Sequence, residues 1–231
     1  QPIAEVARSC SQKGVPLLLD AAQTAGIQPI LADSWNLGMI ACSGHKGLLG
    51  PPGVGILYIR PDLEVLPLLE GGTGSLSEHF LQPEFCPDRY ESGTPNAIGL
   101  TGLSAGVSFI LKQKVEAVRA KEEQRTSRFL QQLKEEKDQV TIYGPNDAQR
   151  QTAVVSFNLK NISPSDAALY FEEKWGIMCR PGLHCAPAAH KTIGTFSQGT
   201  VRFSFGFFHS EKDIDTAAAA VRDLLQKENR L

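Results

Sequence analysis

The segment Ala41-Cys-Ser-Gly-His-Lys-Gly-Leu-Leu-Gly50 sets one lysine in a glycine-rich turn directly after an apolar run at residues 38–42. Upstream, Val15-Pro-Leu-Leu-Leu-Asp20 is typical of a short buried strand that ends in a carboxylate. A third apolar run follows at residues 54–59. Three short apolar runs, near 15–19, 38–42 and 54–59, separated by helical or turn segments, predict an α/β fold.

Lys46 is the only residue with a full formal charge between Ser34 and Ile59. We expect it to lose part of its hydration on folding, which would leave some amine uncharged and able to attack a carbonyl. A lysine in this environment is typical of one that forms a Schiff base. The carboxylate of Asp20 could neutralise the pyridinium nitrogen of pyridoxal 5'-phosphate. Lys46 and Asp20 together therefore predict pyridoxal 5'-phosphate as the cofactor. Each residue also has a plainer interpretation, as a solvated loop lysine and as a turn-forming or helix-capping aspartate.

Two ordered motifs carry a family resemblance. Leu19-Asp-Ala-Ala-Gln23 and Ser43-Gly-His-Lys-Gly-Leu-Leu-Gly-Pro-Pro-Gly-Val-Gly55 resemble the class V aminotransferases, and later motifs resemble their cysteine desulfurase and selenocysteine lyase branch. The resemblance covers nearly the whole chain and corresponds to the C-terminal portion of family members. It implies the α/β fold of type I pyridoxal phosphate-dependent transferases (aspartate aminotransferase-like), with a mostly parallel sheet in the large domain and a small α/β C-terminal domain.

The resemblance also implies roles for five residues around the cofactor. Lys46 would hold the cofactor as an imine and move the substrate's Cα proton, Asp20 would pair with the ring nitrogen, and Gln23 would hydrogen-bond the phenolic oxygen. Ser43 and His45 would hold the phosphate, a task that suits a hydroxyl and an imidazole in the turn of the lysine. The alternative for His45 is a histidine that caps backbone carbonyls in a glycine-rich turn.

Cys179-Arg-Pro-Gly-Leu-His-Cys-Ala-Pro187 resembles the desulfurase motif Arg-x-Gly-x-His-Cys, in which the last cysteine is the nucleophile. That role falls on Cys185, because a thiolate is the group suited to attack the sulfur of a bound cysteine. The glycine and the two prolines predict a loop here. By itself a cysteine is more often a small buried apolar side chain. Leu183 stands where several relatives have a polar residue, so the activation of the thiol is expected to differ.

Thr200-Val-Arg-Phe-Ser-Phe-Gly-Phe-Phe208 alternates apolar residues in the pattern of a half-buried strand, with Arg202 on the opposite face. By resemblance Arg202 binds the α-carboxylate of the substrate through its two-pronged guanidinium, and Arg180 is a second candidate for the same pocket. The alternative is an ordinary exposed arginine on a strand.

Arg89-Tyr-Glu-Ser-Gly-Thr-Pro-Asn96 resembles the family segment in which a threonine reaches the cofactor phosphate of a neighbouring subunit. Thr94 takes that place, so the resemblance implies a homodimer with a shared active site. Without the family match, the segment is typical of a turn followed by a helix start.

Two other motif interpretations fit poorly. Gly50-Pro-Pro-Gly-Val-Gly55 begins like a phosphate-binding P-loop, but the Lys-Ser/Thr pair that should follow is absent. Cys179, His184, Cys185 and His190 lack the two spaced ligand pairs typical of a structural zinc site, so no metal is predicted.

Composition favours a cytoplasmic enzyme without specifying one. The 231 residues are enough to bury a sizeable core. A net charge of −2, an isoelectric point of about 6.2 and interspersed charges give no sign of a nucleic-acid or membrane surface. The five cysteines are irregularly spaced, unlike a secreted disulfide framework. No apolar run approaches the ~20 residues of a membrane span, and no signal peptide is evident.

We expect residues 1–95 to form the C-terminal part of a large cofactor-binding domain, residues 96–136 to form connecting helices, and residues 137–231 to form a small C-terminal domain. Family members have a long N-terminal part before this point.

Local patterns predict six elements within these domains. They are a helix over residues 1–10 that has Ile3, Val6, Ala7 and Cys10 on one face and stops at Gly14, helices over 97–111 and 115–136, a strand over 152–159, and helices that begin after Ser163 and Ser210.

These observations predict a pyridoxal phosphate-dependent cysteine desulfurase or selenocysteine lyase. It would remove sulfur or selenium from L-cysteine or selenocysteine, leaving alanine and a persulfide on Cys185, and would pass the sulfur to an acceptor protein. One alternative is another class V reaction such as transamination, in which Cys185 has no chemical role. A second is a non-catalytic fragment.

Overall fold

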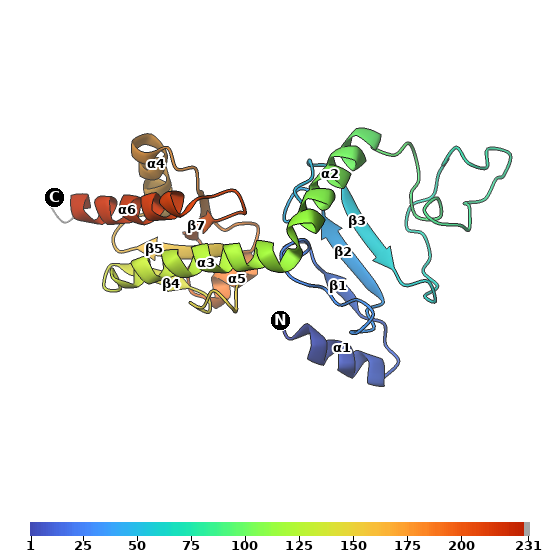
Figure 1. The fold of residues 1–231 in the computed structure, drawn as a ribbon, viewed down its shortest axis with the longest axis horizontal. Coiled ribbons are helices and arrows are strands. Elements are labelled where there is room, and N and C mark those ends of the chain that lie inside the picture. Colours follow the sequence, from blue (N-terminus) through green and yellow to red (C-terminus); the bar gives the residue numbers. More distant parts are fainter. Residues whose placement is uncertain (229–231) are drawn as a thin grey trace. The chain divides into compact units, whose positions relative to one another are not determined.

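A computed structural model describes residues 1–228 of the chain, which divides into two compact units. The first comprises Gln1–Glu116 and the second begins at Ala117 (Figure 1). Both predicted connecting helices are present, as α2 (Ala97–Gln113) and α3 (Val115–Lys134). Residues 229–231 of the predicted small domain lie outside the described residues.

The first unit contains a three-stranded sheet in the order β1 (Leu18–Asp20), β2 (Met39–Ser43) and β3 (Gly55–Ile59). All three predicted strands are therefore present. β1 and β2 are parallel, whereas β2 and β3 are antiparallel. A parallel pair needs a crossover of about a dozen residues or more, which residues 21–38 supply, while residues 44–54 form a shorter return. The sheet is consequently mixed.

Residues 15–19 were expected to form a buried strand, and the predicted burial is wrong. β1 begins only at Leu18, whose side chain is 48% exposed, and Val15 is 54% exposed. β1 is exposed because it is an edge strand of this sheet and has a neighbouring strand on one side only.

Helices α1 (Ile3–Gln12) and α2 supply the helical part of the first core. α1 stops as predicted, since Gly14 adopts a φ of +65° and its N–H donates to Ser11 O while Val15 N donates to Cys10 O. On the predicted apolar face of α1, Ala7 is 2% exposed and Val6 is 40% exposed. The buried core residues of this unit are Ala7, Ala21, Ala25, Leu37, Ile40, Leu48, Leu103 and Ile110.

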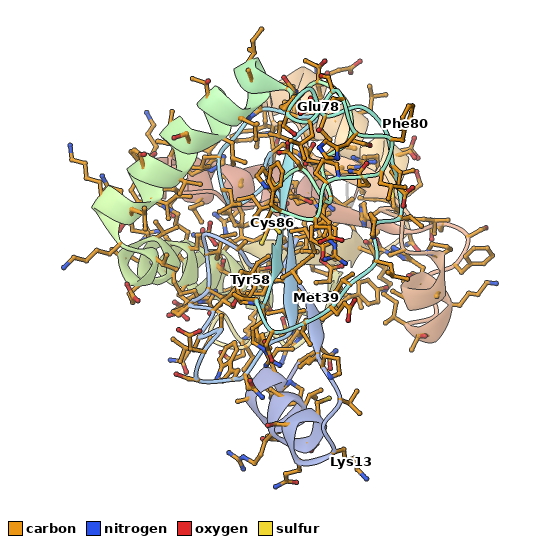
Figure 2. The ribbon with its side chains drawn as sticks, turned by 90° about the vertical axis from the view of Figure 1, so that its right-hand side faces the viewer. Lys13, Met39, Tyr58, Glu78, Phe80 and Cys86 are labelled. Carbon is orange, nitrogen blue, oxygen red and sulfur yellow. The ribbon has the colours of Figure 1, made fainter. Side chains whose placement is uncertain are left out.

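Residues 60–96, all of them described, form neither helix nor strand and loop away from the sheet (Figure 1). Large apolar side chains on this segment are exposed, among them Leu68 at 95% and Phe80 at 105% of full exposure. Figure 2 shows Phe80 on the outer side of the segment, away from the strands that carry Met39 and Tyr58.

The second unit contains a four-stranded antiparallel sheet in the order β4 (Val140–Tyr143), β5 (Val154–Leu159), β7 (Thr200–Ser204) and β6 (Arg180–Gly182). β5 confirms the strand predicted at residues 152–159. β7 confirms the strand predicted from Thr200, although it ends at Ser204. β4 and β6 were not predicted.

Helices α3, α4 (Pro164–Trp175) and α6 (Glu211–Glu228) pack their apolar faces on one side of this sheet. Both predicted helix starts are confirmed, because Ser163 Oγ accepts from Asp166 N at 3.1 Å and Ser210 Oγ accepts from Asp213 N at 3.2 Å. A short helix, α5 (Pro187–Thr192), lies between β6 and β7. The centre of the core is aromatic, with Phe129, Phe157, Phe171, Phe203 and Phe205 in mutual ring contact.

Candidate functional sites

The parallel pair β1–β2 brings two of the predicted site segments to one edge of the first sheet. Asp20 ends β1 and pairs in register with Ala41, and Ala21 N donates to Ala41 O at 2.8 Å. Ser43 ends β2, two residues further along. Because the carboxyl ends of parallel strands meet at the same edge, the turn after Asp20 and the turn after Ser43 are neighbours.

These two turns touch backbone to backbone through glycine. A Cβ added to Gly47 would lie 2.4 Å from Ala25 O, and one added to Gly26 would lie 2.5 Å from Gly47 O. Gly26 also has a φ of +81°, which favours glycine. The turn that carries Lys46 is therefore held directly against the turn that follows Asp20 and carries Gln23. The two glycines that form this contact are visible in the sequence, but the contact itself was not predicted.

The turn of Lys46 is also closed by its own backbone. Leu49 N donates to Lys46 O at 2.9 Å, and Gly50 N donates to Gly44 O at 2.8 Å. On its other side, α2 approaches so closely that a Cβ on Gly106 would lie 2.4 Å from Leu48 O. Lys46 is half-buried in this arrangement and His45 is exposed.

Asp20 is exposed and its Oδ1 accepts from Ala22 N at 2.9 Å, so it does shape the turn as its plainer interpretation predicted. Its second oxygen accepts no hydrogen bond from the part of the chain that the structure describes. Burial raises the pKa of Cys42 on β2, and the negative charge of Asp20 raises it further, which places that carboxylate beside β2. Within residues 1–228 neither Asp20 nor Lys46 forms an ion pair, so both remain available to a ligand.

Thr94 is exposed on the segment 60–96. The preceding residue, Gly93, has a φ of +88° and donates its N–H to Gly72 O at 2.9 Å. This bond joins Thr94 to the glycine-rich loop at residues 71–74.

In the second unit, the two predicted arginines are direct cross-strand partners. Arg180 on β6 lies opposite Arg202 on β7, and Ser156 on β5 lies opposite Arg202 on its other side. Directly opposed residues point to the same face of an antiparallel pair, so both guanidinium groups belong to the face opposite the aromatic core. Arg202 Nε is buried and has no hydrogen-bond partner among residues 1–228. A buried donor without a partner is costly, and a carboxylate ligand would satisfy it.

Cys185 is exposed in the turn between β6 and α5. The predicted loop is confirmed only for residues 183–186, because Pro181 and Gly182 pair with β7 as part of β6 and Pro187 begins α5. The neighbouring His184 bonds through Nε2 to Arg180 O at 2.8 Å. Burial lowers the pKa of His184, and the positive charges of Arg202, His190 and Arg180 lower it further, while the bond to the Arg180 carbonyl partly offsets the effect. The imidazole next to the thiol is therefore largely neutral at neutral pH.

Cys179, the other cysteine of the motif, packs against the aromatic core and burial raises its pKa to about 11. A thiol with so high a pKa supplies almost no thiolate at neutral pH. Of the two cysteines, the exposed Cys185 is the better candidate nucleophile.

Over the described residues, no group of three or more His, Cys, Asp or Glu side chains is arranged to hold a metal ion. Among the helices within residues 1–228, none has both the length and the apolar character needed to cross a membrane.

Known proteins with this fold identify its class. The structure superimposes on the apo cysteine desulfurase of Thermococcus onnurineus with a TM-score of 0.84 at 30% identity, covering 98% of this chain and 56% of that one. The cysteine desulfurase CsdA of Escherichia coli (S-sulfonic acid) gives a TM-score of 0.85 at 25% identity, covering 97% and 55%. The fold is that of the type I pyridoxal phosphate-dependent transferases. The chain belongs to the aminotransferase class-V family, whose model matches residues 1–216.

A curated relative gives the same result at the level of sequence. A probable cysteine desulfurase of Pyrococcus abyssi is 33% identical over 237 residues, which cover 97% of this chain and 56% of that protein. The chain thus spans about half the length of the relatives it matches.

Proposed function

We propose that the protein is a pyridoxal phosphate-dependent cysteine desulfurase or selenocysteine lyase. The observation that carries the proposal is the glycine contact between the turns after β1 and β2, which fixes Lys46 at the sheet edge where Asp20 ends its strand. The relatives named cysteine desulfurase support the same reaction.

The residues at this edge fit the cofactor chemically. Asp20 offers a carboxylate oxygen without a bond, and Lys46 offers an amine that forms no ion pair within the described chain. Ser43 and His45 supply a hydroxyl and an imidazole in the adjoining turn, and Gln23 supplies an amide from the turn after Asp20. These are the donor and acceptor types that a pyridine nitrogen, an aldehyde, a phenolic oxygen and a phosphate require.

In this proposal the cofactor, when bound, serves as the electron sink for the carbanion formed at the substrate's Cα. Lys46 would hold it covalently and would move the Cα proton, and Asp20 would keep the ring nitrogen protonated. Arg202, with Arg180 as its neighbour, binds the α-carboxylate of the amino acid. Its buried Nε without a partner supports this role.

Cys185 receives the sulfur. Its thiolate attacks the substrate's sulfur, a new sulfur–sulfur bond forms, and the Cβ–S bond breaks with its electron pair left on carbon. That carbon takes up a proton and becomes the methyl group of alanine. The products are alanine and a persulfide on Cys185, which a sulfur-acceptor protein would then discharge.

The proposal also includes the oligomeric state, the compartment and the partners of the protein. Thr94 reaches the cofactor phosphate of a second subunit, so that a homodimer shares its active sites. The compartment is the cytoplasm, which is supported by five cysteines that are all free thiols. No nucleic acid or membrane partner is proposed.

The test compares three variants of the full protein. Cys185→Ala should abolish sulfide release from cysteine, whereas Cys86→Ala, which removes another exposed thiol, should not. Lys46→Ala should abolish the visible absorption of bound cofactor, and borohydride should link cofactor to the peptide that contains Lys46 in the parent protein only. Transamination that survives in Cys185→Ala, with no desulfuration in the parent, would instead identify another class V reaction. A parent protein that binds no cofactor would identify a non-catalytic protein.

A further inference from the structure

The turn that presents Cys185 has an unfavourable backbone. His184 has a φ of 51° and Cys185 a φ of 60°, so two consecutive residues with a Cβ adopt the left-handed conformation that glycine favours. Such residues are held there only when surrounding contacts compensate the cost. The contacts that stabilise this turn therefore determine where the thiol lies.

Two hydrogen bonds act within the turn itself. Ala186 N donates to Leu183 O at 2.8 Å and closes it, and His184 Nε2 bonds to Arg180 O at 2.8 Å. The second bond anchors the His184 ring to β6. The His184 ring also contacts a second ring.

The second ring is that of His190, which belongs to α5 and is 4% exposed. Its ring centroid lies 5.7 Å from that of His184. Its Nδ1 is 2.7 Å from Thr195 Oγ1, and Thr195 N donates to His190 O at 2.9 Å. Thr195 is itself buried, at 7% exposure. The two bonds hold the His190 ring from both its side chain and its backbone.

We propose that His190 and Thr195 are positioning residues for Cys185. The Thr195 hydroxyl fixes the orientation of the His190 ring, and that ring holds His184 in the conformation that keeps the left-handed turn closed. Neither residue touches the reacting atoms, and neither belonged to the predicted site. The proposal rests on the proposed function in one respect, because it assigns the purpose of the turn to the thiol chemistry of Cys185.

The chain offers a matched set of variants. Thr195→Val removes the hydroxyl and keeps the shape, while Thr195→Ser keeps the hydroxyl. Thr192→Val is the control, because Thr192 lies on α5 with His190, is exposed, and donates its hydroxyl to Ala188 O at 3.0 Å. His190→Asn keeps a group that can bond to Thr195 but removes the ring that packs on His184.

The first measurement is hydrogen exchange of the Ala186 amide in the full protein without cofactor. Loss of one buried hydrogen bond should speed its exchange by about 2- to 12-fold in Thr195→Val. Exchange should also be faster in His190→Asn, and it should match the parent in Thr195→Ser and Thr192→Val. Equal exchange in Thr195→Val and Thr192→Val would overturn the proposal.

The second measurement is steady-state desulfuration by the holoenzyme. Thr195→Val should lower kcat by about the same factor as it speeds exchange, with KM for cysteine and the cofactor absorption unchanged, because only the step at Cys185 is affected. A rise in KM with unchanged kcat would contradict the assignment. If the parent forms no persulfide at Cys185, the proposed function fails. The exchange experiment still decides whether His190 and Thr195 hold the turn.

Discussion

Replacing Gly47 by alanine tests whether a backbone contact positions the turn of Lys46. The new Cβ would lie 2.4 Å from Ala25 O and 2.8 and 2.9 Å from two carbons of the Ile27 side chain. Ile27 can rotate, but the carbonyl of Ala25 cannot, so one of the two turns must shift. Overpacking of this kind costs about 1–3 kcal/mol.

The cost should appear in two assays. For a chain of this size about 1 kcal/mol lowers the midpoint of thermal unfolding by 2–4 °C, so we expect Gly47→Ala to unfold about 2–12 °C lower, followed by circular dichroism. Since the shifted turn carries Lys46, the variant should also bind less cofactor, measured as visible absorbance per protein after dialysis.

Gly72→Ala is the matched control, because a Cβ there would meet no atom within 4 Å. Its unfolding and its cofactor content should equal those of the parent. If Gly47→Ala unfolds at the same temperature as Gly72→Ala and binds as much cofactor, the two turns are not in the contact described and the reasoning is refuted.

Three further predictions concern the second unit. Phe129→Ala should lower its free energy of unfolding in urea by about 3–5 kcal/mol, because Phe129 is fully buried with ring centroids 4.9 Å from Phe205 and 5.5 Å from Phe203. Ser163→Ala should cost about 1 kcal/mol in the same assay by removing the cap of α4, whereas no loss would show that the cap is dispensable. Burial raises the pKa of Glu122 from 4.5 to about 7, with the charges of Arg119 and Arg125 only partly opposing it. The folded protein then keeps a proton that the unfolded chain releases, so stability should fall as pH rises from 4.5 to about 7, and Glu122→Gln should flatten that fall in urea midpoints measured across the range.

The elements that sequence predicted correctly are those whose signals are local. The caps at Ser163 and Ser210 and the stop at Gly14 each depend on a few neighbouring residues, and all three are present. The burial of β1 and the direction of β3 depend on which strands stand beside them, and a run of apolar residues does not encode that. β6 escaped prediction because it has three residues, one of which is Pro181.

The candidate site residues show the same difference between what local sequence predicts and what depends on tertiary contacts. The motifs identify Lys46, Asp20, Cys185 and Arg202 by residue type and order, and their chemical roles stay predictions. The contacts that position them are tertiary, and a sequence without a structure does not show them. The hydrogen bond between His190 and Thr195 is local, but it also escaped prediction, since a histidine and a threonine five residues apart have no distinctive pattern.

The two proposed reactive residues are positioned in physically different ways. The turn of Lys46 is set by glycine contacts between backbones, so its position tolerates changes of neighbouring side chains but hardly any added Cβ. The turn of Cys185 is closed by one backbone hydrogen bond and is held in addition by side chains, namely the His184 ring, the His190 ring and the Thr195 hydroxyl. Single substitutions can therefore adjust the thiol in small steps while leaving the lysine in place. We therefore expect substitutions that alter how sulfur is taken up and passed on to lie around Cys185, and the turn of Lys46 to stay constant.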